Sequence, residues 1–323
     1  MKTVITDHPF PTLDLAQAIF SRHGIDLEAM QARDAETVIA RARTADAMMV
    51  GMARIDKKVV DALERCKVIV RLGVGFDNVD LPAATSRRIM VVNVPDFCTE
   101  EVSDHAMALI LIIARRVIPG QKAVREGKWG PMAIDFTSFK RVREQTLGLY
   151  GFGRIARGMA EKARGFKMAC VAYDPFVSKE AMAATGVEKV DLKELLIRSD
   201  YLSLHSPLTK ETENAFGLEE FRTMKPTAWI INTSRGPVIR EEDLIKALDD
   251  RMIAGAALDV LAKEPPDGNH PLLNRENVIL TPHMASWTWD SRNDLQTKGA
   301  EEVVRALKGE RPKNLVNPEV LSR

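Results

Sequence analysis

The chain has 323 residues, a length that favours about two domains and a core large enough to fold without disulfides or metals. Its formal net charge is +1 and it contains no long basic run, so nucleic acid and anionic membranes are disfavoured as partners. Three widely spaced cysteines without a C-x-x-C pair argue against a disulfide framework and a zinc site, and they favour a reducing, cytoplasmic location. The most apolar run, 106–114, is too short to span a bilayer.

Short apolar strands alternate with helical patterns in the first hundred residues, as is typical of a parallel α/β sheet. We predict strands at 4–5, 47–50, 67–72 and 90–94, and helices at 13–23 and 59–65. A long helix is predicted over 100–118, with Thr99 as its cap and Pro119-Gly120 as its end. The polar segment from there to residue 144 is interpreted as an irregular connecting arm.

A second α/β run begins at Thr146 with a strand that enters a glycine turn. Further strands are predicted at 168–173, 201–204, 228–232, 254–260 and 278–280, and helices at 154–164, 192–197, 218–223, 241–248 and 290–307. About six strands are expected of a doubly wound dinucleotide-binding sheet. The tail after Gly309 is expected to be extended.

The glycine turn has the pattern G-x-G-x-x-A, formed by Gly151, Gly153 and Ala156. In such a turn the first glycine permits the tight bend, and the second lets the backbone approach a pyrophosphate at the helix N-terminus. Asp174 ends the next strand, where its carboxylate would accept hydrogen bonds from ribose hydroxyls. The absence of an adjacent arginine favours NAD, although Lys179 leaves NADP open. The alternative interpretation is a glycine turn without a ligand.

Three charged residues stand shortly after apolar strands in the second half of the chain. They are Arg235, Glu264 and His283. Because ligands bind outside the carboxyl ends of strands in open α/β sheets, these residues are candidates for chemistry. Taken singly, Glu264 reads equally well as part of a surface turn, and His283 as a packed loop histidine.

With these motifs in order, the sequence resembles the D-isomer-specific 2-hydroxyacid dehydrogenases, and within them the branch of the C-terminal-binding-protein co-repressors. The resemblance covers nearly the whole chain. It rests on RLGVGFDNVD at 71–80, on 92–95, on the Gly151 turn, on HSPLT at 205–209 and on the three charged segments. It implies an NAD-dependent oxidoreductase that transfers hydride between nicotinamide and a small 2-oxo or 2-hydroxy acid. It also implies a homodimer in which the arm at 119–145 takes part.

The resemblance makes Arg235, Glu264 and His283 the catalytic residues. The planar fork of an arginine suits a carboxylate beside a carbonyl, and a histidine can exchange a proton with the substrate oxygen. A neighbouring carboxylate favours the protonated imidazole and fixes its orientation. Cofactor contacts are assigned to Gly151, Gly153, Arg154, Ile155, Asp174, His205, Ser206, Pro207, Thr212, Thr233, Ser234 and Asp259. Substrate contacts are assigned to Arg71, Gly73, Val74 and Gly75, whose backbone N–H groups would form an anion nest.

We therefore expect two Rossmann-like, doubly wound parallel-sheet domains. Residues 1–101 and 292–323 would form a discontinuous, flavodoxin-like substrate domain, and residues 102–291 the NAD-binding domain. Two alternatives stay open: an NAD(H)-binding co-repressor-like or scaffold protein with little turnover, and a domain with degenerate catalysis. Ser286 stands where the co-repressor branch has a large aromatic residue, so the preferred substrate side chain also stays open.

Overall fold

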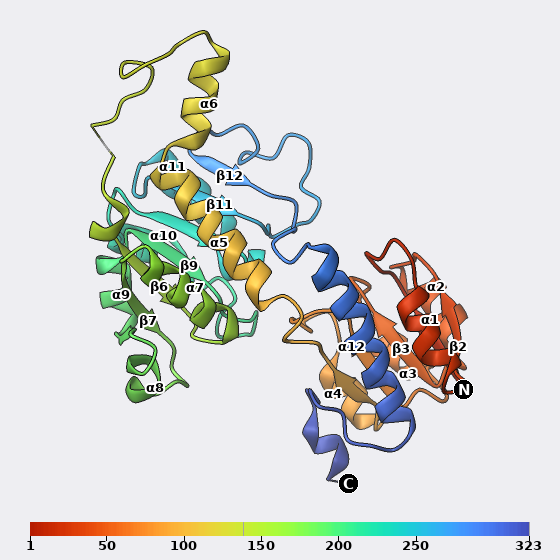
Figure 1. The fold of residues 1–323 in the computed structure, drawn as a ribbon. Helices are drawn as coiled ribbons and strands as arrows, with labels where there is room; N and C mark the ends of the chain where they lie inside the picture. Colours follow the sequence, from red (N-terminus) through yellow and green to blue (C-terminus); the bar gives the residue numbers. More distant parts are fainter. Residues whose placement is uncertain (138, 323) are drawn as a thin grey trace. The chain divides into compact units, whose positions relative to one another are not determined.

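The computed structural model describes residues 1–137 and 139–322, which form two compact units (Figure 1). Unit 1 comprises Met1–Cys98 and Trp287–Arg323, and unit 2 comprises Thr99–Ser286. Each unit is built around a parallel sheet, so the predicted α/β fold class is confirmed. Within residues 1–137 and 139–322, no helix combines the length and apolar character that a membrane crossing needs.

Unit 1 has the flavodoxin-like strand order. Its described residues form a five-stranded sheet ordered β2-β1-β3-β4-β5, in which all pairs are parallel. The strands are β1 (Lys2–Ile5), β2 (Asp26–Ala29), β3 (Ala47–Val50), β4 (Val68–Arg71) and β5 (Met90–Val92). The helices are α1 (Asp14–Ser21), α2 (Ala35–Ala42), α3 (Lys57–Ala62), α4 (Leu81–Ser86) and α12 (Trp289–Leu307). Every strand therefore ends at one edge of the sheet, called here the carboxyl edge.

The sequence pattern does not predict β2, α2 and α4. β2 lacks apolar alternation because it is a polar edge strand with no fully buried residue. α2 depends on Asp34, whose carboxylate accepts a hydrogen bond from the Thr37 N–H at 2.9 Å. The helix predicted over 59–65 begins earlier, because Asp56 caps α3 through the Val59 N–H, and it ends at Ala62.

The C-terminal segment completes unit 1. Gln296 on α12 accepts from the Ala16 N–H at 2.9 Å and donates to the Thr12 carbonyl at 2.8 Å, which joins α12 to the start of α1. The tail is extended only in part: Leu315 pairs antiparallel with Val92, and the chain then forms a 3-10 turn, η3 (Pro318–Leu321).

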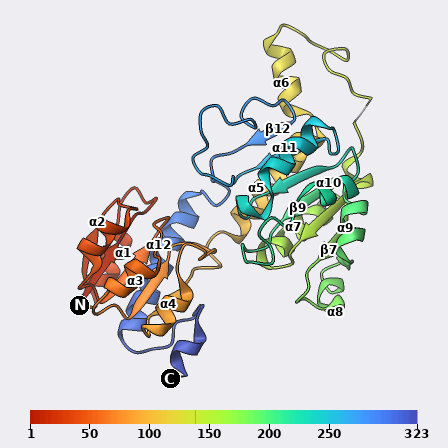
Figure 2. The ribbon, with the colours of Figure 1, turned by 180° about the vertical axis from the view of Figure 1, so that it is seen from behind.

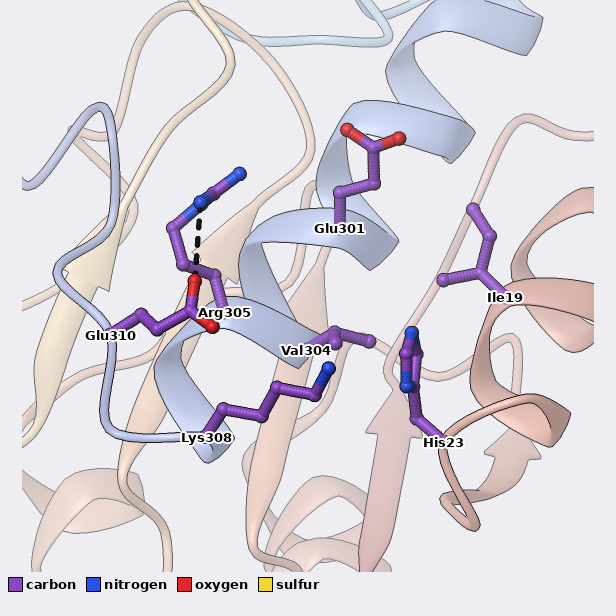
Figure 3. A pocket seen from close by; sticks show the side chains of 7 residues that line it. All are labelled: Ile19, His23, Glu301, Val304, Arg305, Lys308 and Glu310. Carbon is purple, nitrogen blue, oxygen red and sulfur yellow. Dashed lines mark hydrogen bonds and ion pairs between the residues drawn. The ribbon is translucent and has the colours of Figure 1, made fainter.

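A cavity of about 160 Å³ opens between the ends of α1 and α12 (Figure 3). It is lined by polar side chains that include His23, Lys308 and Arg305, and Arg305 pairs with Glu310 at 3.4 Å. Gly24, next to His23, accepts from the Met1 amino group, so this cavity lies at the edge where the strands begin. Ligands of α/β sheets bind at the opposite edge.

Unit 2 has the dinucleotide-binding order. Its described residues form a seven-stranded parallel sheet ordered β12-β11-β10-β9-β6-β7-β8. The strands are β6 (Thr146–Tyr150), β7 (Ala169–Tyr173), β8 (Glu188–Lys189), β9 (Tyr201–Leu204), β10 (Trp229–Asn232), β11 (Gly255–Leu258) and β12 (Val278–Leu280). The strand order reverses where β6 pairs with β9, and this switch point is where such sheets bind dinucleotides. The strand beyond the predicted six is β8, a two-residue edge strand.

Helices cover both faces of the unit 2 sheet (Figures 1 and 2). The helices are α5 (Thr99–Ala114), α6 (Val117–Arg125), α7 (Arg154–Gly165), α8 (Lys179–Ala183), α9 (Leu192–Arg198), α10 (Leu218–Thr223) and α11 (Glu241–Asp249). α5 and α7 pack their apolar residues on one face, and α9, α10 and α11 pack theirs on the other. Coverage of both faces is why these strands read as continuous apolar runs.

The single helix predicted over 100–118 is wrong. The chain breaks between α5 and α6 at Arg116, which adopts a left-handed conformation with φ 50° and ψ 40°. Pro119 does not end a helix but lies in the first turn of α6, where backbone N–H groups have no helical partner and proline is tolerated. α6 therefore occupies the start of the arm, which the sequence predicts to be irregular. Residues 126–137 and 139–141 of the arm form neither helix nor strand, and η1 (Val142–Glu144) leads into β6.

Candidate active site

The glycine turn joins β6 to α7 at the switch point. Gly151 has φ 86°, and a Cβ there would lie 3.0 Å from the Ser206 nitrogen and 3.1 Å from the His205 carbonyl carbon. Gly153 is the N-cap of α7, and apart from its own chain neighbours no described atom lies within 4 Å of a Cβ built on it. The N-terminus of α7, which begins with Arg154 and Ile155, is therefore open to an anionic group such as a diphosphate.

Asp174 follows β7 and is tied to the glycine turn. Its Oδ2 accepts from the Phe152 N–H at 2.8 Å, and its Oδ1 accepts from the Phe176 and Val177 N–H groups at 2.8 and 3.2 Å. A carboxylate has about four lone-pair sites, so these bonds leave capacity for a ligand hydroxyl. The acid is thus held in place beside the turn rather than mobile.

Two predicted cofactor residues carry buried hydroxyl groups beside the glycine turn and at the end of the neighbouring strand. Among the described residues, the hydroxyls of Ser206 and Thr233 have no hydrogen-bond partner. Ser206 follows β9 beside Gly151, and Thr233 follows β10, the next strand in the sheet. Because buried polar groups in proteins are nearly always paired, both hydroxyls fit a polar ligand at this edge.

Hydrogen bonds among its own residues and with the end of β9 hold the loop that follows β9. The His205 Nε2 lies 2.9 Å from the Ser203 hydroxyl, and burial lowers the pKa of His205 to about 4, so this ring is neutral at neutral pH. The Thr212 hydroxyl donates to the Pro207 carbonyl at 2.6 Å and accepts from the Thr209 N–H at 2.8 Å. His205 and Thr212 therefore shape the loop that presents Ser206.

Asn232 shapes the turn that carries Arg235. Its side chain is fully buried, donates to the Arg235 carbonyl at 2.9 Å, and accepts from the Ser234 N–H and hydroxyl at 3.0 and 2.9 Å. The Arg235 Nη1 donates to the Ser234 carbonyl at 2.9 Å. This role of Asn232 is not predicted from the sequence, although an amide at the end of an apolar strand is a visible signal for it.

Gly236 brings the Arg235 turn against the segment that leads to Glu264. A Cβ on Gly236 would lie 2.0 Å from the carbonyl carbon and oxygen of Leu261 and 2.5 Å from the Ala262 nitrogen. These are backbone atoms, which cannot swing aside as a flexible side chain can. Only a glycine fits this position, a requirement that the sequence pattern does not predict.

We expect Gly236→Ala to separate these two turns, with a loss of ~1–3 kcal/mol or more in unfolding free energy from overpacking. The matched control is Gly268→Ala, because no described atom lies within 4 Å of a Cβ at Gly268. Thermal unfolding and kcat/KM are measured for both variants. A Gly236→Ala protein that matches Gly268→Ala in both quantities would show that the close approach is not needed.

His283 and Glu264 are in direct contact. The His283 Nδ1 lies 2.6 Å from the Glu264 Oε2, and the Glu264 Oε1 accepts from the Leu261 N–H at 3.0 Å. Burial raises the pKa of Glu264, but the hydrogen bond and charge of His283, the Leu261 N–H and the charge of Arg235 together hold it below its usual value. Glu264 is therefore ionised at neutral pH and orients the imidazole.

Asp259 organises the loop on which His283 lies. Its carboxylate, 2% exposed, accepts from the Thr281 hydroxyl at 2.6 Å and from the Met284 and Ala285 N–H groups at 2.9 and 2.8 Å. The His283 N–H donates to the Asp259 carbonyl at 2.8 Å. On the other side of Thr281, the ring of His105 lies 3.0 Å from the same hydroxyl. Asp259 and His105 thus support the left-handed backbone of His283, which has φ 52°.

The predicted substrate residues lie at the carboxyl edge of unit 1. Arg71 ends β4 and is 8% exposed; its guanidinium donates to the Leu72 carbonyl at 3.1 Å and contacts the Met52 sulfur at 3.7 Å. Gly73 makes room for it, since a Cβ there would lie 1.5 Å from the Arg71 Nη1. The Val74 carbonyl, which precedes Gly75, accepts from the Asn93 amide at 2.6 Å.

A larger cavity of about 320 Å³ also lies in unit 1. Its lining residues are Pro9, Pro11, Trp287, Thr288, Trp289 and Arg292. The Arg292 guanidinium lies over the Trp287 ring at 5.4 Å. In the part of the chain that the structure describes, no cluster of three or more His, Cys, Asp or Glu side chains is placed to hold a metal ion.

Comparisons with known proteins agree with this geometry. Residues 107–285 match the NAD binding domain of the D-isomer specific 2-hydroxyacid dehydrogenases. The chain is 40% identical over 292 residues to the glyoxylate reductase of Korarchaeum cryptofilum, which covers 88% of this chain and 87% of that protein. It is 36% identical over 321 residues to the D-3-phosphoglycerate dehydrogenase of Archaeoglobus fulgidus, covering 98% of this chain and 59% of that protein.

Among solved structures, the D-lactate dehydrogenase of Aquifex aeolicus complexed with NAD and lactic acid superposes with a TM-score of 0.90 at 25% identity. The match covers 98% of this chain and 99% of that one. The predicted resemblance is therefore confirmed at the level of the family. The chain belongs to the D-isomer-specific 2-hydroxyacid dehydrogenases and is an NAD-dependent oxidoreductase that acts on the CH–OH group of a 2-hydroxy acid.

Proposed function

We propose that this enzyme reduces a small 2-oxo acid with NADH, and oxidises the corresponding D-2-hydroxy acid in reverse, through Arg235, Glu264 and His283. The observation that carries the proposal is the 2.6 Å contact of His283 with an ionised Glu264, on a turn packed against the one that holds Arg235. The glyoxylate reductases among the relatives support a substrate as small as glyoxylate.

The three side chains have different roles in this mechanism. The Arg235 guanidinium holds the substrate carboxylate and polarises the neighbouring carbonyl. Because the Nδ1 of His283 is engaged by Glu264, the proton is given to the substrate oxygen, and taken back in oxidation, at Nε2. Glu264 stabilises the imidazolium form. The nicotinamide, when bound, supplies the hydride for reduction and accepts it in oxidation.

We assign the cofactor to unit 2 and the substrate nest to unit 1, close to the predicted domains of 102–291 and of 1–101 with 292–323. The open N-terminus of α7 and the buried hydroxyls of Ser206 and Thr233 fit a dinucleotide. The other proposed cofactor contacts are Gly151, Gly153, Arg154, Ile155, Asp174, His205, Pro207, Thr212, Ser234 and Asp259. The proposed substrate contacts are Arg71, Gly73, Val74 and Gly75.

Asp174→Ser is expected to relax the preference for NADH over NADPH. The carboxylate accepts hydrogen bonds from ribose hydroxyls but repels a 2′-phosphate. Its removal should therefore weaken the binding of NADH and remove the repulsion of NADPH. The measurement is kcat/KM for both cofactors with one 2-oxo acid. An unaltered ratio would show that the ribose is read elsewhere.

The substrate is tested by following NADH consumption with glyoxylate, hydroxypyruvate and pyruvate. Turnover of at least one of these acids is expected. Tight NADH binding without turnover of any of them overturns the small-acid proposal, and favours the scaffold alternative named above.

We also propose a homodimer formed through the arm. Large apolar side chains are exposed there, with Trp129 at 84%, Met132 at 91% and Phe136 at 58%. Soluble monomers rarely expose such a patch, and α6 extends away from the unit 2 sheet (Figure 1). A solution mass of one chain, 35.9 kDa, measured by light scattering, would contradict the dimer.

The thiols of Cys66, Cys98 and Cys170 support a reducing, cytoplasmic location.

A further inference from the structure

A buried carboxylate, Asp7, follows β1 at the carboxyl edge of unit 1. It is 3% exposed and accepts hydrogen bonds through both oxygens. Oδ2 accepts from the Met52 N–H at 2.8 Å, and Oδ1 accepts from the Ala53 N–H at 3.1 Å and the Thr6 hydroxyl at 2.9 Å. The Arg33 guanidinium pairs with Oδ2 at 3.0 Å. Asp7 thus accepts two hydrogen bonds from the backbone of a loop more than forty residues away in the chain.

The same loop is also held by Asn78. The Asn78 amide donates to the Gly51 carbonyl at 3.1 Å and to the Ala53 carbonyl at 2.8 Å. A Cβ on Gly51 would lie 2.5 Å from the Asp7 carbonyl oxygen, so the loop and the end of β1 are in close contact. Residues 51–53, called here the clamped loop, are therefore fixed by side chains and not by a helix or strand.

The clamped loop contacts a proposed substrate residue. Met52 projects from it with 45% exposure, and its sulfur accepts from the Arg71 Nη2 at 3.7 Å. The guanidinium therefore contacts both the Leu72 carbonyl on its own strand end and the sulfur on the clamped loop. A shift of the clamped loop would move the Met52 sulfur and so change its contact with the Arg71 guanidinium.

We propose that Asp7 is a positioning residue for the substrate site. By holding the Met52 and Ala53 N–H groups, it sets the clamped loop, and through Met52 it sets the guanidinium of Arg71 for the substrate carboxylate. Asp7 itself does not touch the substrate. This inference rests on the proposed function, which places the 2-oxo acid at Arg71 and the Gly73–Gly75 nest.

Unit 1 offers a matched control in Asp46. Asp46 is 6% exposed, accepts from the Lys2 N–H at 2.8 Å and pairs with the Arg65 guanidinium at 2.8 Å. It therefore makes the same kinds of bonds as Asp7. However, it precedes β3 and bonds the first residue of β1, so it lies at the opposite edge of the sheet. A purely structural role would make the two substitutions equivalent.

The test compares Asp7→Asn with Asp46→Asn in the full chain. We measure KM for glyoxylate or the best acid of the panel, kcat, the Kd for NADH, the thermal midpoint and hydrogen exchange at residues 51–53. Both variants are expected to lower the thermal midpoint. Only Asp7→Asn is expected to raise KM for the acid, by about tenfold or more, because small misplacements of binding groups are costly. NADH binding should not change, and exchange should accelerate at Met52 and Ala53.

A double-mutant cycle tests the proposed route. Met52→Leu changes an exposed side chain, removes the sulfur contact and should raise KM by itself. When it is combined with Asp7→Asn, the further rise in KM should be smaller than the effect of Met52→Leu alone, because both substitutions act through Arg71. An unchanged KM in Asp7→Asn, an equal rise in Asp46→Asn, or full additivity overturns the inference. If Asp7→Asn does not fold, Arg33→Met, which removes one donor to Asp7 from the surface, must raise KM or the inference fails. A wild-type enzyme without turnover instead overturns the proposed function, and the inference with it.

Discussion

His283→Asn is expected to lose most of kcat while NADH still binds with its normal Kd. Asparagine can fill the site beside Glu264, but it cannot exchange a proton at neutral pH. General acid–base catalysis contributes ~10²–10⁴-fold, which sets the size of the loss. Steady-state kinetics in both directions and fluorescence titration with NADH measure the two quantities. A variant with normal turnover would remove His283 from the mechanism.

The control is a second histidine–carboxylate pair in unit 2. The His270 Nε2 lies 2.8 Å from the Glu241 Oε1, and its side chain is 16% exposed. His270→Asn therefore breaks a pair of the same kind in which neither side chain is one of the three proposed catalytic residues. It should leave kcat within a factor of a few of the wild-type value, so an equal loss in both variants would indicate a structural cause.

Arg235→Lys is expected to lower kcat/KM for the 2-oxo acid by about 10²-fold. Lysine keeps the charge that helps hold the pKa of Glu264 below its usual value, so the His283–Glu264 pair should persist. What is lost is the planar fork that binds a carboxylate through two parallel hydrogen bonds. NADH binding should not change.

Arg240→Lys is the matched control for this substitution. Arg240 is exposed at the start of α11 and pairs with Asp243 at 3.6 Å, where a single charge suffices. Its kcat/KM should equal that of the wild-type enzyme. An Arg235→Lys enzyme that behaves like Arg240→Lys would show that Arg235 does not clamp the substrate.

Local patterns were enough for elements whose ends are marked in the sequence. The predicted strands at 47–50 and 278–280 and the helix at 218–223 coincide with β3, β12 and α10. The predicted helix over 100–118 fails because nothing local marks the left-handed residue Arg116, and proline is as acceptable in a first turn as after a last one. Strand β2 could not be predicted from the sequence because it lies at the edge of the sheet, and an edge strand need not be apolar on either face.

The sequence by itself determined the α/β class, most of the apolar strands, the glycine turn with its acid, and the charged residues at strand ends that mark the family. These follow from period and spacing along the chain, which adjacent residues encode. Only the tertiary structure decided which contacts hold the loops at these strand ends: Gly236 against Leu261, Asp259 on the His283 loop, and Asp7 on the clamped loop. The physical reason is that each of these contacts joins segments far apart in sequence. Such a contact forms only after the sheet has brought the ends of its strands to one edge.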